Sequence, residues 1–278
     1  MTYSIVARDP ETGELGVAVQ SRAFNTGAVV PWAAPGVGAV ATQSYTEMSY
    51  GPLGLDLLRA GRSPQDALAE LVAADEDSAY RQVAFLDAQG RVAVHVGESC
   101  IPAAGFAAGD GFSAQANMVD SERVWESMAE AFEGSEGPLA ERLLSALDAA
   151  EAAGGDWRGR QAGGIVVVGS EGQPWERELD LRVDDHPDPL GELRRLLRLR
   201  RAYEAMRGPP GPSEDDLETL PELDRRLAAI FGATATGRVD EARELLRPLL
   251  EEEPRWGDFI RSLGDRELLP HAAELLDG

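Results

Sequence analysis

Residues 1–21 read MTYSIVARDPETGELGVAVQS, and this stretch decides the fold. A β-favouring run at 2–8 is followed by the turn signal Asp-Pro-Glu-Thr-Gly and by a second β-favouring run at 14–21. This pattern predicts an antiparallel hairpin. In such a hairpin the end of the second strand lies beside the start of the first. We therefore expect Ser21 to lie near Thr2.

Thr2 itself points to one kind of chemistry. Removal of Met1, which is usual before a residue as small as threonine, would leave Thr2 with both a hydroxyl and a free α-amine. A hydroxyl is a poor nucleophile until a base takes its proton, and an α-amine with a reference pKa of roughly 8 can be that base. The alternative is that Thr2 is merely the first residue of a strand.

The composition leaves few other ways to activate a nucleophile. All 26 basic residues are arginine, which removes lysine as a Schiff-base former or general base. The single cysteine, Cys100, allows no intramolecular disulfide and is expected to be a buried structural thiol. No G-x-S-x-G elbow accompanies the three histidines. No glycine-rich phosphate loop opens a helix, and no cofactor is predicted.

Length and charge bound the class of protein. With 278 residues, 43% apolar and 27% charged, the chain is expected to be globular, with one large domain or two. A net charge of -23 argues against a nucleic-acid partner. No run approaches the roughly 18 to 20 apolar residues of a membrane span, and the N-terminus lacks the pattern of a signal peptide. We expect a cytoplasmic protein without a membrane partner.

The order of the predicted elements indicates an α+β fold. Strands, two helices, strands, two helices and strands follow one another, which favours a layered sandwich with helices on each outer face. The further strands are predicted at 37–44, 81–87, 91–97, 111–119, 164–169 and 176–183. The helices are predicted at 51–60, 64–74, 121–133 and 138–153.

Several segments of the chain carry a resemblance to a known family. They include SIVARDPETGELGVAV, SYGPLGLDLL, CIPAAG, AQANM, AAGGDWRGRQ and DLRVDDHPDP, in consistent order through roughly residues 1–205. On these motifs the chain resembles family 1028 of the domains of unknown function, which is placed in the N-terminal-nucleophile (Ntn) hydrolase superfamily. The resemblance implies a four-layer αββα sandwich and amide-bond hydrolysis by a residue at the mature N-terminus.

The candidate catalytic residues are Thr2, Ser21 and Asn117. Ser21 could hydrogen-bond the α-amine of Thr2, and Ser4 points to the same face of the strand as Thr2. Asn117 lies among apolar neighbours, so its amide either satisfies buried backbone or donates to an oxyanion. Asparagine is a common oxyanion donor in the Ntn superfamily, although Ala116 stands where the family motif has glycine.

The candidate substrate-binding residues are Arg22, Gln43, Arg158 and Arg160. Arg22 and Gln43 end predicted strands at what could be one rim. The two arginines of the loop GDWRGRQ could hold a substrate carboxylate with bidentate hydrogen bonds, and the alternative is a salt bridge to Asp156 or Glu151. The expected partner is thus a small-molecule amide. The two arginines could bind such a substrate if it carries a negative charge.

The segment Asp-Asp-His-Pro-Asp-Pro at 184–189 resembles a set of metal ligands, but no metal is predicted there. Adjacent ligands on an extended chain diverge, and the two prolines favour a fixed turn. Asp188 is instead expected near the N-terminus of the following helix, where a carboxylate is favoured.

The C-terminal part differs in character. A proline-glycine linker at 207–213 separates a first domain at 1–206 from a helical domain at 214–278. The phrase ATATGRVDEARELLRPLLEEEPRW resembles a tetratricopeptide helix pair, and a tail of this kind on this family has been called a peptidoglycan-binding module. A single repeat unit cannot bury its own face, so we expect a homodimer or higher homo-oligomer, or docking on the first domain.

Two function classes follow. The first is an amidohydrolase that cleaves a non-peptide or peptide-like C–N amide bond, with Thr2 as the nucleophile. The second is a non-catalytic Ntn-like scaffold that binds through its helical tail.

Overall fold

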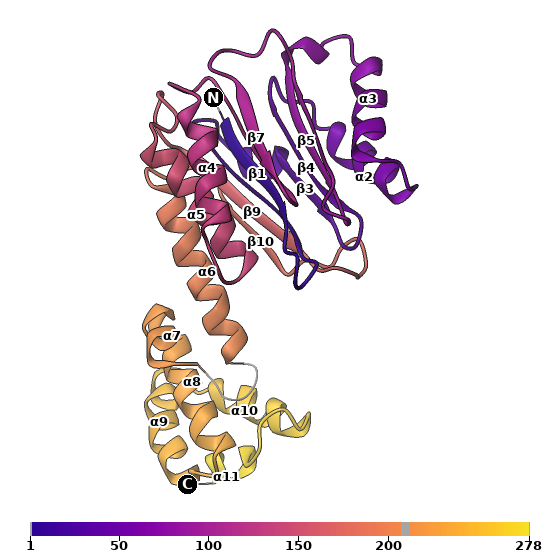
Figure 1. Cartoon of the computed structure of the whole chain (residues 1–278). Helices are drawn as coiled ribbons and strands as arrows, with labels where there is room; N and C mark the ends of the chain where they lie inside the picture. Colours follow the sequence, from indigo (N-terminus) through magenta and orange to yellow (C-terminus); the bar gives the residue numbers. More distant parts are fainter. Residues whose placement is uncertain (1, 207–211, 278) are drawn as a thin grey trace. The chain divides into compact units, whose positions relative to one another are not determined.

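The computed structural model describes residues 2–206 and 212–277 (Figure 1). The chain divides into two compact units, Met1–Arg194 and Arg195–Gly278, and the division falls within helix α6 (Pro189–Ala205). Of the predicted linker at 207–213, residues 207–211 lie outside the described residues. The two units are described separately below.

The first unit contains two antiparallel sheets (Figure 1). The six-stranded sheet has the spatial order β10 (Leu179–Val183), β9 (Ala162–Val168), β2 (Leu15–Ser21), β1 (Thr2–Arg8), β8 (Phe112–Asn117) and β7 (Gly105–Gly109). The four-stranded sheet has the order β3 (Pro31–Ala34), β4 (Gly38–Ser44), β5 (Arg81–Asp87) and β6 (Val92–Val96). The mixed α+β class predicted from the sequence is confirmed.

The predicted hairpin forms the centre of the larger sheet. Thr2 pairs with Ser21 and the register continues along both strands to Arg8 and Leu15. Alternate side chains of β1 and β2 turn to opposite faces. One face packs against the second sheet through an apolar cluster shared by both sheets, which includes Val6 and Leu86. Both strands are therefore buried almost throughout.

Helices cover the outer faces of the two sheets. The six-stranded sheet contacts α4 (Arg123–Glu133) and α5 (Leu139–Ala152), and the four-stranded sheet contacts α2 (Tyr50–Arg59) and α3 (Pro64–Ala74). Ser63 caps α3 by accepting the N–H of Asp66, as its position before Pro64 predicts. Helix α5 lies close to β2, because a Cβ on Gly16 would come within 2.6 Å of a methyl carbon of Leu143.

Four short elements of the first unit were not predicted. They are β3, β7, the helix α1 (Thr26–Val29) and the 3-10 turn η1 (Ser78–Tyr80) before β5. Strands β3 and β7 each lie at one edge of their sheet. Their proline-, alanine- and glycine-rich sequences have low strand propensity, so pairing with β4 and β8 decides their conformation.

The antiparallel topology gives the first unit two ends. Seven segments lie at the end where β1 begins, which we call the Thr2 end: 22–30, 45–49, 75–80, 97–104, 118–122, 153–161 and 184–188. Seven others lie at the opposite end: 9–14, 35–37, 60–63, 88–91, 110–111, 134–138 and 169–178. Gln43 and Gln82 of the smaller sheet hydrogen-bond to strands of the larger one, which aligns the two sheets at the Thr2 end.

The second unit is all-helical beyond α6. It contains α7 (Glu214–Thr219), α8 (Glu222–Ala235), α9 (Val239–Glu252), α10 (Trp256–Asp265) and α11 (Ala272–Leu276). Its apolar side chains form a core of their own, to which Leu246 and Leu249 of α9 and Ile260 of α10 belong. The stripe on α9 is thus covered within the unit. None of the described helices is both long enough and apolar enough to cross a membrane.

Candidate active site

Thr2 is the middle member of a row of three side chains at the Thr2 end. Ser21 on β2 and Asn117 on β8 are its register partners on either side, so the three residues turn to the same face, toward the smaller sheet. The Thr2 hydroxyl donates to Oγ of Ser21 over 3.1 Å. The predicted proximity of Ser21 to Thr2 is therefore present, and Thr2 is only 8% exposed.

The backbone carbonyl of Thr2 is held by two buried amides. Nε2 of Gln43 lies 3.4 Å from this carbonyl oxygen, and Nδ2 of Asn117 lies 3.5 Å from it. Both amides also donate to Oε1 of Gln82, over 2.7 Å and 3.0 Å. Gln82 in turn donates to the carbonyl of Ala116 over 2.9 Å. Thr2 is thus fixed from the smaller sheet as well as from its own.

A second set of buried contacts continues this network inward. Ser4 donates to Oε1 of Gln43 over 2.6 Å, and Gln115 donates to the hydroxyl of Ser4 over 2.6 Å. We call Ser4, Gln43, Gln82, Gln115 and Asn117 the amide cluster. Every member is buried and hydrogen-bonded, which makes such a network rigid and specific.

Gln82 and Gln115 were not predicted as site residues. Each is a glutamine next to an apolar residue in a predicted strand, in RQVAFLD and FSAQAN, and that pattern was the available signal. Gln43 was predicted to bind substrate, but it is fully buried with both amide atoms bonded. Its position favours a role in holding Thr2 over direct contact with a substrate.

Asp156 ties the loop before β9 to the Thr2 end. Its buried carboxylate accepts the backbone N–H of Arg22 over 2.9 Å and the guanidinium of Arg158 over 3.0 Å. Asp156 also forms an isolated β-bridge with Val119, two residues after Asn117. The guanidinium of Arg22 itself is exposed and donates to Gln161. Arg22 and Arg158 are therefore both anchored near the row that contains Thr2.

Arg160 has different partners. It pairs with Glu151 of α5 over 3.1 Å, and Glu151 accepts the hydroxyl of Tyr3 over 2.5 Å. Burial, with Glu151 adding to it, raises the pKa of the Tyr3 phenol well above its usual value. Because Tyr3 faces away from the Thr2 side of the sheet, Arg160 belongs to the helix layer. There it lines a pocket of about 380 Å³ with Asp188 and others.

The two loop arginines thus engage separate acids, and the structure does not bring them together as one fork. Both of the salt bridges that the sequence allowed, to Asp156 and to Glu151, are present. Asp188 accepts the N–H of Gly191 over 3.1 Å, in the first turn of α6, as predicted. Within the described residues, no three His, Cys, Asp or Glu side chains converge as a metal site would require.

An ion pair between the buried Arg81 and the partly buried Asp75 supports the smaller sheet at the Thr2 end. Arg81 binds Asp75 through Nε over 2.8 Å and through Nη2 over 3.3 Å, and it donates to the carbonyl of Tyr45 over 2.7 Å. Hydrogen bonding from Arg81 lowers the pKa of Asp75, and Asp75 raises that of Arg81. The thiol of Cys100 is buried and donates to the carbonyl of Arg81, a structural role as predicted.

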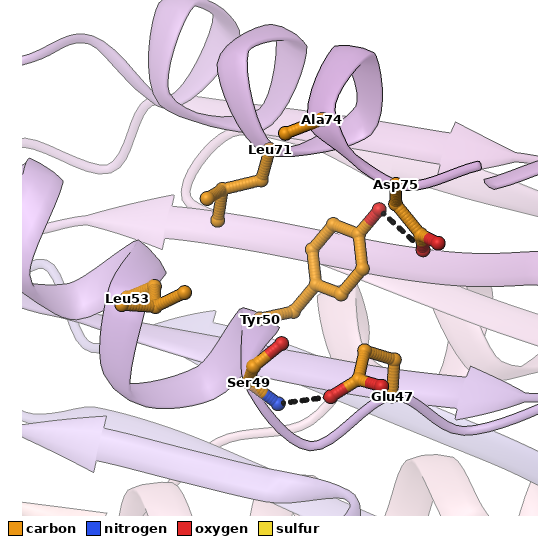
Figure 2. A pocket seen from close by; sticks show the side chains of 7 residues that line it. All are labelled: Glu47, Ser49, Tyr50, Leu53, Leu71, Ala74 and Asp75. Carbon is orange, nitrogen blue, oxygen red and sulfur yellow. Dashed lines mark hydrogen bonds between the residues drawn. The ribbon is translucent and has the colours of Figure 1, made fainter. Parts of the chain in front are cut away.

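Asp75 also borders a pocket of about 270 Å³ where α2 begins and α3 ends (Figure 2). The ring of Tyr50 crosses this pocket, and its hydroxyl donates to Asp75 over 3.1 Å. Burial raises the pKa of the Tyr50 phenol, and Asp75 adds to the shift. Leu53 and Leu71 form the apolar side of the pocket, opposite the carboxylate of Glu47.

Solved structures similar to this chain include two of low sequence identity. No curated protein matched. Two similar solved structures are titled Anbu. The ancestral beta-subunit from Yersinia bercovieri is 11% identical, with a TM-score of 0.32, and the match covers 74% of this chain and 98% of that chain. A mutant from Hyphomicrobium is 13% identical, with a TM-score of 0.35, and the match covers 73% of this chain and 97% of that chain.

A DUF1028 protein from Silicibacter pomeroyi, with a known crystal structure, is 32% identical over 75% of this chain and 90% of its own, with a TM-score of 0.66. The family described as "Family of unknown function (DUF1028)" matches residues 2–193, and that match ends one residue before the first compact unit does. The chain belongs to the DUF1028 family.

Proposed function

We propose that the first unit is an amidohydrolase of the Ntn type, with Thr2 as the nucleophile after removal of Met1. The observation that carries this proposal is the way Thr2 is held. Its hydroxyl meets Ser21 at 3.1 Å, and its carbonyl faces two buried amides from both sheets. A buried strand-end carbonyl needs a hydrogen-bond partner in any protein. A nucleophile in addition gains rate from being held in place from both sheets.

The layered arrangement supports the same proposal. Two stacked sheets with a helix pair on each outer face are what the Ntn resemblance implies, and β1 and β2 lie at the centre of the larger sheet. In this αββα interpretation the nucleophile begins a central strand and opens toward the partner sheet. The position of Thr2 meets that description.

The proposed reaction is an acyl transfer to Thr2 followed by hydrolysis. The α-amine of Thr2, directly or through a water, takes the hydroxyl proton while Oγ1 attacks the amide carbon. Collapse of the tetrahedral intermediate breaks the C–N bond, and the departing amine receives the proton from the α-ammonium. Water then attacks the ester, releasing a carboxylic acid and restoring the Thr2 hydroxyl. The substrate is a small molecule with a non-peptide or peptide-like C–N amide bond.

Ser21, Asn117 and Arg158 have supporting roles in this proposal. Ser21 orients the Thr2 hydroxyl before attack. Asn117 stabilises the oxyanion, because its contact with the Thr2 carbonyl is long at 3.5 Å and can be exchanged for a stronger charge-assisted bond. Arg158, with Arg22, attracts a substrate that carries a carboxylate. Gln43 and Gln82 position Thr2 without touching the substrate.

Two measurements test the proposal against a non-catalytic scaffold. Intact mass spectrometry of the purified protein should show the loss of one methionine, ~131 Da, because a free Thr2 amine is required. A panel of small amides should then be hydrolysed by the wild type and not by Thr2→Ala, while Thr2→Ser retains part of the rate. Equal turnover by the wild type and Thr2→Ala, or a retained Met1, would reject Thr2 as the nucleophile.

A further inference from the structure

Large apolar side chains are exposed mainly at one end of the first unit. Six such residues lie in the loops of the Thr2 end, each between 44% and 68% exposed: Phe24, Tyr45, Met48, Tyr80, Ile101 and Trp157. In the loops of the opposite end, within the described residues, the corresponding residue is Trp175. We call the six residues the apolar rim. Exposed apolar groups gathered in one region commonly mark a binding surface.

Backbone contacts connect the rim to the row that contains Thr2. The N–H of Tyr45 donates to the carbonyl of Tyr80 over 3.2 Å, directly after the β4 strand that ends beyond Gln43. The N–H of Met118, the residue after Asn117, donates to the carbonyl of Ile101 over 2.9 Å. These contacts place rim residues from both sheets around the same strand ends.

The other side of the rim is tied in through Asp156. Trp157 follows this buried aspartate, which accepts the N–H of Arg22, two residues before Phe24. Arg22 follows Ser21, the register partner of Thr2. Rim residues on both sides are thus joined through the backbone to the strand ends that carry the candidate active site.

We propose that the apolar rim binds a large apolar group, alkyl or aromatic, on the acyl side of the substrate amide. This inference rests on the proposed function and specifies its substrate class. Because the rim loops adjoin the strand ends that carry Thr2, burial of such a group against the rim would stabilise a substrate whose amide carbon lies at Thr2. A second copy of the chain pressed on the whole rim would instead cover Thr2, which is why we assign the rim to the substrate.

The direct test uses three amides of one amine: N-acetylglycine, N-hexanoylglycine and N-phenylacetylglycine. Release of glycine is followed with an amine-reactive dye. Each buried methylene should raise kcat/KM by about fourfold, so the hexanoyl and phenylacetyl compounds should exceed the acetyl compound by at least about tenfold. A flat response along the series would overturn the proposal.

Two tryptophans offer matched variants. Trp157 on the rim and Trp175 at the opposite end are 60% and 75% exposed. Trp157→Ser should lower the hexanoyl-to-acetyl ratio of kcat/KM by about threefold or more, and Phe24→Ser should do the same. Trp175→Ser should leave that ratio unchanged. An equal effect of Trp157→Ser and Trp175→Ser would contradict a role for the rim.

Calorimetric titration of Thr2→Ala with the same three compounds separates this proposal from the proposed function. Binding that tightens with the apolar group, without turnover by the wild type, would uphold the rim and reject the hydrolase. Turnover without a preference for the apolar group would uphold the hydrolase and reject the rim. A change of molecular mass by light scattering in Trp157→Ser would reassign the rim to an interface between copies, and absence of binding to any compound would also overturn the proposal.

Discussion

The two ends of the first unit are built from the same strands, yet they differ in backbone as well as in surface. At the opposite end the residues with positive φ are glycines, such as Gly13, Gly61 and Gly90, within the described residues. At the Thr2 end three non-glycine residues adopt this conformation: Asn25, Ser44 and Met118, with φ of 61°, 73° and 57°. One end thus uses ordinary turn chemistry, and the other tolerates strain.

The strained residues lie next to the groups that hold Thr2. Ser44 follows Gln43, and Met118 follows Asn117. Each residue whose side-chain amide contacts the Thr2 carbonyl is therefore followed by a left-handed residue. Strain of this kind persists only where the surrounding structure fixes it, and it collects at functional sites. The comparison teaches that left-handed non-glycine residues in the described part of the first unit lie only at the Thr2 end, two of them directly after residues that hold Thr2.

The largest expected effect comes from blocking the α-amine. Insertion of a glycine between Met1 and Thr2 leaves a glycine before Thr2 after trimming, so Thr2 loses its own base. Amide hydrolysis should fall on the order of 100-fold to 10,000-fold, with an unchanged thermal transition. A glycine inserted after Gly172, at the opposite end, is the control and should leave turnover intact. If both insertions behave alike, the two ends do not differ in function.

Asn117→Ala should have the next largest effect. Loss of one oxyanion donor lowers kcat on the order of 100-fold to 1000-fold, so this variant should be crippled but not dead. Gln115→Met, in the same strand and the same cluster, is a useful comparison because Gln115 does not touch the Thr2 carbonyl through its side chain. KM and kcat measured for both variants distinguish a catalytic role from a purely structural one. A similar, small loss in the two would make Asn117 a structural residue.

The ion pair of Arg81 and Asp75 should contribute more stability than its counterpart at the opposite end. There Arg142 reaches Asp9 through a single contact of 3.4 Å. Removing one partner of a buried pair costs about 3 kcal/mol. Because Arg81 is buried and Asp75 only partly so, Asp75→Asn should lower the free energy of unfolding by at most about that amount at pH 7. Asp9→Asn should lower the free energy of unfolding by a smaller amount. Urea unfolding of both variants measures the difference.

The effect of Asp75 should also depend on pH, with a definite sign. Its pKa is lowered in the folded protein, chiefly by hydrogen bonding from Arg81. The stability that Asp75 contributes is therefore complete above its unfolded pKa of about 4 and is lost as the pH falls through the folded value. The wild type and Asp75→Asn should converge in acid. A constant difference between them down to the lowest pH that keeps the fold would contradict this linkage.

The smallest expected effects have opposite signs at the two ends. Ser44→Gly removes a strained left-handed residue and should raise the free energy of unfolding by about 1 kcal/mol. Gly61→Ala introduces such a residue at φ +85°, where a Cβ meets nothing within 4 Å, and should lower it by about 1 kcal/mol. If Ser44→Gly also lowers turnover, the strain at the Thr2 end serves the site. If both variants change the free energy of unfolding in the same direction, the two ends do not differ in backbone strain.

Much of the fold was accessible from local patterns. The hairpin of β1 and β2 follows from alternation around one turn signal, and the four long helices of the first unit follow from apolar periodicity and from caps such as Ser63. The edge strands β3 and β7 did not follow, because their conformation depends on the neighbouring strand. The same dependence explains why the predicted strand at 111–119 ends at Asn117, where the chain turns left-handed at Met118.

The candidate site divides in the same way. The neighbourhood of Thr2 and Ser21 followed from hairpin geometry, which is a local constraint. The partners of Gln43 and of the two loop arginines did not, because hydrogen bonds and ion pairs form between segments that only sheet stacking brings together. Gln43 turned inward to the Thr2 carbonyl, and Arg160 joined Glu151 in the helix layer.

By itself, the sequence determined that a small hydroxyl residue begins a central hairpin strand, and that helix pairs and strands alternate in an α+β order. Periodicity and turn chemistry act over a few residues, so the sequence expresses them directly. Only the tertiary structure decided that Gln82 joins Gln43 and Asn117 behind Thr2, and that exposed apolar side chains gather at one end. Those features depend on how two sheets stack, and stacking is settled by contacts between residues far apart in the chain.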